Sequence, residues 1–201
     1  MTALRNGEVV IPIHRPAWKE RLFFFISGMI SSIPLTLFVS QFADSLLSSL
    51  SSFYAVLFST VLFAPFLEEF AKAFPLLYRH GETERSVFTL GLLVGLGFGF
   101  VEFLIYVFVF GVPFVFRLAG VLFHGASTSI TAYGIATKRG LTFYLIAVGL
   151  HFSNNFSAFV QFSVDPAALF GPWSLGGQVV MFVALYLSYR LYNKTSEKIA
   201  T

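Results

Sequence analysis

The 201-residue sequence lacks cysteine and is poor in charged residues. The absence of cysteine excludes disulfides, a thiol nucleophile and a thiolate metal site. Charged residues make up 11% of the chain, against about 25% in a typical soluble protein. Hydrophobic residues make up 56%, and a globule of this composition could not cover its surface with polar groups. We therefore expect the apolar residues to face lipid, in an all-α, polytopic membrane helix bundle.

Six segments are long and apolar enough to cross a bilayer, which requires about 20 residues in a helix. These segments are 22–43, 53–78, 86–110, 114–137, 141–163 and 173–192. No polar stretch between them is long enough for a separate soluble domain, so residues 1–201 are expected to form one membrane domain. The lipid bilayer is the expected partner and nucleic acid is not. The sequence predicts no particular oligomeric state.

The positions of lysine and arginine predict the orientation of the bundle, because cytoplasmic loops are rich in these residues. They fall in the N-terminal segment, in alternate loops and in the C-terminal segment: Arg5, Arg15, Lys19, Arg21, Arg79, Arg85, Lys138, Arg139, Arg190, Lys194 and Lys198. The first, third and fifth loops contain none. This alternation supports six transmembrane helices and predicts that both termini are cytoplasmic.

Several ionisable side chains fall inside the predicted spans, where a charge costs several kcal/mol and is by default a functional candidate. They are Glu68, Glu69 and Lys72 in the second span, Glu102 in the third, His124 in the fourth, and His151 with Asn155 in the fifth. At a rise of about 1.5 Å per residue, four of these spans place a polar group about 12–15 Å from a span end. In a hydrocarbon core about 30 Å thick, these groups lie at nearly one level.

The two adjacent glutamates are expected to have different roles, because neighbouring helical residues point about 100° apart. Glu68 and Lys72 share a helix face. One glutamate would act in catalysis, while the other orients it or pairs with Lys72. Arg117 lies nearly on the face of His124, and we expect it to extend to the membrane interface rather than to bind an acidic partner.

A glycine stripe runs along the third span, at Gly91, Gly95 and Gly99. Small residues at four-residue spacing allow transmembrane helices to pack closely. Glu102 follows Gly99 by three residues, so it is expected to point into the bundle.

The available groups favour chemistry in which a water molecule is activated. The sequence contains no evident Ser–His–Asp arrangement and no pair of aspartates in its spans. A buried glutamate can act as a general base, with a histidine sharing the proton. An asparagine amide can stabilise an oxyanion. Alternatively, two histidines and a glutamate could bind zinc, although the absence of an H-E-x-x-H motif requires such a site to be assembled from separate helices.

Four motifs in this order resemble the PrsW family of intramembrane proteases, which is similar to the CAAX prenyl endopeptidases and other glutamic membrane proteases of that group. The motifs are Glu68-Glu69-x-x-Lys72, Phe98-x-x-x-Glu102, His124-x-x-x-Thr128 and His151-x-x-x-Asn155. They cover residues of about 60 to 160. Glu102 stands where the CAAX relatives carry a histidine, so prenylated substrates are not expected.

The resemblance implies hydrolysis of peptide bonds within the membrane. It implies that Glu68 or Glu69 activates water and that His151 and Asn155 stabilise the oxyanion. Glu102 and His124 would complete the polar site. The implied substrate is a single-span or membrane-anchored protein, as in site-one cleavage of a regulatory membrane protein, and the implied location is a bacterial or archaeal plasma membrane.

Three alternatives to a metal-free glutamic protease remain open at this point. We expect no cofactor, since the second motif supplies Glu102 rather than a further histidine, but a zinc protease built on the same residues is the first alternative. The second is a proton-coupled transporter, for which the halves of the sequence show no convincing repeat. The third is a scaffold without catalytic activity.

Overall fold

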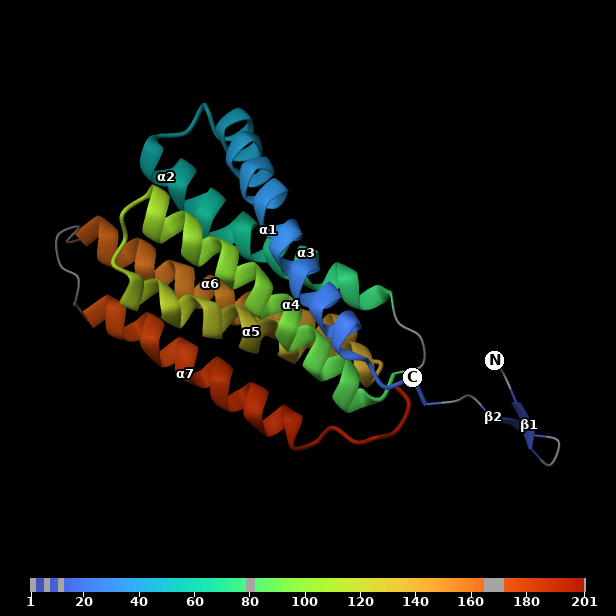
Figure 1. The fold of residues 1–201 in the computed structure, drawn as a ribbon. Coiled ribbons are helices and arrows are strands. Elements are labelled where there is room, and N and C mark those ends of the chain that lie inside the picture. The colour runs from blue at the N-terminus through green and yellow to red at the C-terminus, as the bar shows by residue number, and fades with distance from the viewer. Residues whose placement is uncertain (1–2, 6–7, 11–12, 79–81, 165–171, 201) are drawn as a thin grey trace.

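The computed structural model describes residues 3–5, 8–10, 13–78, 82–164 and 172–200. This part of the chain is helical apart from a short antiparallel hairpin, strands β1 (Ala3–Arg5) and β2 (Glu8–Val10), which stands beside the bundle in Figure 1. The all-α prediction is therefore confirmed for the bundle itself. Arg79, which contributes to the predicted charge pattern, lies outside the described residues.

Each of the six predicted segments coincides with a helix or an unbroken series of helical elements. The elements are α1 (Trp18–Leu46), α2 (Ser52–Val56), the π-helix η1 (Leu57–Phe63), α3 (Ala64–Ala73), the 3-10 helix η2 (Phe74–Leu77), α4 (Glu84–Leu104), the π-helix η3 (Ile105–Val109), α5 (Phe114–Ala136), α6 (Gly140–Val164) and α7 (Pro172–Tyr192). The second and third segments are thus continuous helices whose hydrogen-bond register changes along their length.

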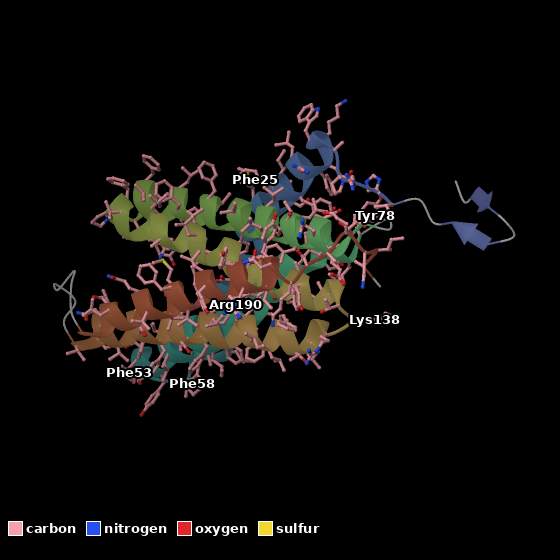
Figure 2. All side chains as sticks on the ribbon, turned by 90° about the horizontal axis from the view of Figure 1, so that it is seen from below. Phe25, Phe53, Phe58, Tyr78, Lys138 and Arg190 are labelled. Atoms are coloured by element: carbon pink, nitrogen blue, oxygen red, sulfur yellow. The ribbon has the colours of Figure 1, made fainter. Side chains whose placement is uncertain are left out.

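In the described part of the chain, three helical stretches are long and apolar enough to cross a membrane: Ser52–Leu77, Glu84–Val109 and Gly140–Val164. Helix α5 packs against α4, α6 and α7, and its residues 123–132, which include most of its polar side chains, are buried. Because its neighbours enclose it, α5 can carry polar side chains that would be unfavourable against lipid. Apolar side chains project outward from the bundle, as Phe53 and Phe58 illustrate in Figure 2.

Helices α4 and α5 form the centre of the bundle, with α1 packed on α4 and with α6 and α7 packed on α5 (Figure 1). Buried apolar side chains fill the space between these helices. One cluster joins Phe24 of α1 to Val94 of α4 and Ala132 of α5, and another joins Phe123 of α5 to Ala184 of α7. This packing fixes α5 in position, and α5 carries His124.

The glycines of α4 allow close helix contacts on two faces. A Cβ atom at Gly95 would clash with the carbonyl oxygen of His124 in α5, and one at Gly97 would clash with the carbonyl oxygen of Phe25 in α1. The predicted small-residue stripe therefore lies in a helix–helix interface. As a consequence, Glu102 reaches α5 within hydrogen-bonding distance of His124.

Two prolines shape the second segment near its acidic residues. Pro65 lies in the first turn of α3, directly after the π-helix η1, and Pro75 lies in the 3-10 helix η2. Proline is tolerated in the first turn of a helix, where its missing N–H has no partner in the helix, and it disturbs a helix interior. Glu68, Glu69 and Lys72 thus lie in a short regular α-helix between a π-helix and a 3-10 helix.

Candidate active site

A cavity of about 480 Å³ lies between the helices and is bordered by α2, η1, α3, α4, η3, α5 and α6. Its polar lining consists of Ser59, Thr60, Glu68, Glu102, Tyr106, Arg117, His124, His151, Asn154 and Asn155. Five of the six predicted site residues therefore border one space. The sixth, Glu69, is fully buried directly behind this lining, in contact with His151.

Glu69 is the centre of a buried hydrogen-bond network that supports the cavity wall. Its Oε1 atom accepts hydrogen bonds from Lys72 Nζ at 2.6 Å, from His151 Nδ1 at 2.9 Å and from Ser127 Oγ at 3.1 Å. The side chains of Glu69 and Lys72 are both 0% exposed. The expectation that one glutamate pairs with Lys72 is confirmed, and the partner is Glu69.

The His124 ring is held at both nitrogens. Lys72 Nζ lies 3.0 Å from its Nδ1, and Glu102 Oε2 lies 2.8 Å from its Nε2. An ammonium group has only donors, so Nδ1 must accept and the ring proton of His124 is on Nε2, from which it is donated to Glu102. Lys72 of α3 is therefore linked directly to His124 of α5 and, through Glu69, to His151 of α6.

Glu68 differs from the other two carboxylates in its surroundings. No Lys or Arg of the described chain is within ion-pair distance of it, whereas Lys72 pairs with Glu69 and Arg117 with Glu102. Its Oε2 atom has no hydrogen-bond partner in the described chain, which is also true of Oε2 of Glu69. Oε2 of Glu68 lies 3.6 Å from Nε2 of His151. Because Glu69 accepts the proton of Nδ1, the neutral ring of His151 presents an unshared electron pair at Nε2 toward Glu68.

Asn155 borders the cavity one helical turn beyond His151 on α6. Its Nδ2 atom donates to the backbone carbonyl of Thr60 at 3.0 Å. Thr60 belongs to the π-helix η1, and single turns of π-helix are frequent at functional sites. A carboxamide nitrogen has two hydrogens, so this contact positions Asn155 and leaves one N–H for another acceptor.

The expected position of Arg117 was wrong. Its Nη2 atom lies 3.4 Å from Glu102 Oε2, and its guanidinium stacks over the ring of Tyr106 at 3.6 Å. Tyr106 lies in the π-helix η3, which turns its ring toward α5. The seven-residue separation of Arg117 from His124 already indicated the correct face, but nothing in the sequence revealed the Tyr106 platform. Ser127, the third donor to Glu69, was also missed.

The donor set for a metal ion can be tested against these contacts. Glu68, His124 and His151 offer ligand atoms that all lie within 4.8 Å of one another. Two of them fit well: Glu68 has a free oxygen, and Glu69 orients His151 as carboxylates orient metal-binding histidines. His124 does not fit in its present state, because its Nε2 proton bonds to Glu102. A metal cation at Nε2 would also be separated from the buried ammonium of Lys72 only by the imidazole ring of His124, so the two positive charges would repel each other.

The fold and this cavity define a multi-pass membrane protein with a polar, carboxylate- and imidazole-lined site between its helices. The model of the PrsW family, described as an intramembrane metalloprotease family, matches residues 16–188. The chain belongs to this family. No match was found among curated proteins or among solved structures. Membership in this family suggests intramembrane protease activity. It does not decide between a glutamic and a metal-dependent mechanism.

Proposed function

We propose that this protein is an intramembrane endopeptidase in which Glu68 is the general base for a metal-free hydrolysis. The observation that carries the proposal is the difference between the two adjacent glutamates. Glu69 does not line the cavity, and its Oε1 atom is held by Lys72, Ser127 and His151, whereas Glu68 lines the cavity and accepts no hydrogen bond at Oε2 from the described chain. A carboxylate must be free to accept a proton if it is to activate water.

In this mechanism, a water molecule on the cavity side is held by both the Glu68 carboxylate and His151, whose Nε2 lies 3.6 Å from Glu68 Oε2. Glu68 removes one proton of the water while His151 accepts a hydrogen bond from the other. The water oxygen bonds to the peptide carbonyl carbon, and the π electrons of the carbonyl bond move to the carbonyl oxygen. Collapse of this intermediate breaks the C–N bond, and Glu68 delivers its proton to the leaving nitrogen. The products are a carboxylic acid and an amine.

Two groups can stabilise the oxyanion of the intermediate. Asn155 has one amide hydrogen not used by Thr60, and Arg117 presents its guanidinium to the cavity beside Glu102. A positioned donor in such a site contributes about 3–4 kcal/mol to the rate. His151 is an acceptor in its neutral state, so we assign it to water positioning rather than to the oxyanion role that the family resemblance implies.

The complete membrane arrangement is part of the proposal: six transmembrane helices in one domain, both termini cytoplasmic, in a bacterial or archaeal plasma membrane. In this orientation the cavity extends from the acidic cluster toward the outer side, because its further lining residues Ser59, Tyr106 and Phe162 lie in the outer halves of their helices. Such an opening suits a single-span or membrane-anchored protein cleaved near its outer end, as in site-one cleavage of a regulatory protein.

The direct test is cleavage of a fluorescently labelled single-span protein by purified enzyme in liposomes. We expect a discrete cut within or beside the substrate's outer membrane segment. The same liposomes report proton uptake through an entrapped pH dye. Proton uptake without any cleavage would favour the transporter alternative. Absence of both activities, together with full complementation of a deletion by Glu68→Ala, would favour a scaffold.

A zinc protease is the second candidate, favoured by the proximity of Glu68, His124 and His151. These three residues would hold the metal, with Glu69 orienting His151. A bound zinc would supply Lewis acidity and a more acidic water. The hydrogen bonds of His124 to Lys72 and Glu102 oppose this arrangement.

Metal analysis separates the two catalytic types. We expect purified, active protein to contain well below one zinc per chain, and cleavage to persist after dialysis against a chelator. A matched His124→Gln variant should have the same metal content as the wild type. One zinc per chain that is lost in His124→Gln, together with chelator-sensitive cleavage, would contradict the metal-free mechanism and establish the metalloprotease.

A further inference from the structure

A second cavity, of about 380 Å³, lies at the end of the bundle where α1 and α4 begin and α7 ends. It shares no lining residue with the acidic cavity. Its polar lining consists of Arg15, Arg21, Arg85, Ser86, Thr89, Tyr192 and Glu197. We call this space the arginine pocket. It does not take part in the peptidase mechanism, and its residues lie outside the four motifs that carry the family resemblance.

The arginine pocket has an excess of positive charge. Three guanidinium groups face one carboxylate, so its lining side chains carry a net charge of +2. Glu197 lies 3.9 Å from Arg15 and 3.8 Å from Arg85, which is longer than a hydrogen bond. Arg21 makes no ion pair within the described part of the chain. The pocket therefore presents uncompensated donors to an anion.

The walls of the arginine pocket are held in place by the segment that follows α7. Arg85 Nη2 donates to the carbonyl of Thr195 at 3.0 Å, and its guanidinium lies over the ring of Tyr192 at 5.4 Å. Glu84 accepts hydrogen bonds from the backbone nitrogen and hydroxyl of Ser196 at 2.9 and 2.8 Å. These contacts join the end of α7 to the start of α4, so Arg85 is oriented before any ligand arrives.

The level of the pocket along the bundle indicates the source of its ligand. Tyr192 lines the pocket, and Trp18 lies in the sequence between the lining residues Pro16 and Arg21. These aromatic side chains are 41% and 68% exposed, and such side chains prefer the level of lipid headgroups. One turn further along α1, the apolar Leu22 and Phe23 are exposed. The arginine pocket thus lies at the boundary between the apolar surface of the bundle and its charged end.

We propose that the arginine pocket binds the phosphate group of an anionic phospholipid. Planar guanidinium groups match phosphate oxygens through paired hydrogen bonds. Basic pockets between transmembrane helices are suited to anionic headgroups. Phosphate on a soluble ester offers the same chemistry, but the position of the pocket beside exposed apolar surface favours the lipid. The proposal does not depend on the peptidase activity.

The test compares lipid retention by native mass spectrometry of protein in detergent with added phosphatidylglycerol or phosphatidylcholine. We expect the wild type to retain phosphatidylglycerol selectively. Arg21→Gln should weaken retention about fivefold, and Arg15→Gln/Arg21→Gln about twenty-five-fold, since each basic residue contributes to headgroup attraction. Arg139→Gln is the matched control. Arg139 follows Lys138, which Figure 2 shows at the end of the bundle nearest the N-terminal hairpin, and it does not line the pocket.

A competition arm separates the two sources of phosphate. Glycerol 3-phosphate should displace bound phosphatidylglycerol only at concentrations far above that of the lipid, which supports a lipid site. Equal retention of phosphatidylglycerol by the wild type, Arg21→Gln and the double variant, at unchanged melting temperatures, would overturn the proposal. Displacement by glycerol 3-phosphate at equal concentration would overturn the assignment to lipid and identify a soluble phosphate ester as the ligand.

Discussion

Glu68→Gln is expected to lower the rate of substrate cleavage by roughly 10²–10⁴-fold, the usual contribution of a general base. Glutamine keeps the size of the side chain and one acceptor oxygen, but its amide group cannot take a proton from water. The side chain of Glu68 is 12% exposed and makes no ion pair with Lys or Arg in the described chain. We therefore expect the folded state to tolerate this substitution. The measurement is the single-turnover cleavage rate of the single-span substrate in liposomes.

Glu20→Gln is a matched control for this experiment. Glu20 pairs with His14 on the surface of the bundle, away from both glutamates of the site. It should retain the wild-type cleavage rate. Comparable melting temperatures for the two variants would show that the loss in Glu68→Gln is chemical. If Glu68→Gln cleaved at the wild-type rate, Glu68 could not be the base and the proposed mechanism would be wrong.

The positions of the helices were predictable from the sequence because their physical cause is local. Runs of apolar residues identify each helix to within a few residues, and α6 extends over Gly140–Val164 against a predicted span of 141–163. The different surroundings of Glu68 and Glu69 were also predictable, because adjacent helical residues point in different directions. Which of them would face the cavity depended on the positions of α5 and α6, and these follow from packing.

The remaining parts of the site depend on features with no simple sequence signal. The π-helices η1 and η3 change the hydrogen-bond register within continuous apolar segments. The first brings the carbonyl of Thr60 to Asn155, and the second brings Tyr106 beneath Arg117. A uniform helical periodicity cannot anticipate either contact. Ser127 was missed for another reason: a serine in an apolar helix usually bonds to its own backbone, and only the approach of α3 gives it Glu69 as a partner.

The second large effect is expected from Lys72→Met, which should destabilise the protein by about 3–5 kcal/mol, the usual consequence of removing one partner of a buried ion pair. Glu69 would then remain buried with Ser127 and His151 but without its cation. Methionine is similar in length to lysine, so loss of packing contributes little. The measurement is the free energy of unfolding in mixed detergent micelles. Lys194→Met, at the end of the bundle, is the control and should change stability by less than about 0.5 kcal/mol.

The double variant Glu69→Gln/Lys72→Met separates stability from catalysis. Replacing both charges with neutral side chains of similar shape should recover most of the lost stability, because no unpaired charge stays buried. Cleavage should nevertheless stay low, since Glu69 no longer provides the carboxylate that orients the His151 ring at 2.9 Å. A double-mutant cycle, completed by the single variant Glu69→Gln, gives the coupling energy of the pair. Coupling near zero, with Lys72→Met as stable as the wild type, would mean that Lys72 is not the electrostatic support of the site.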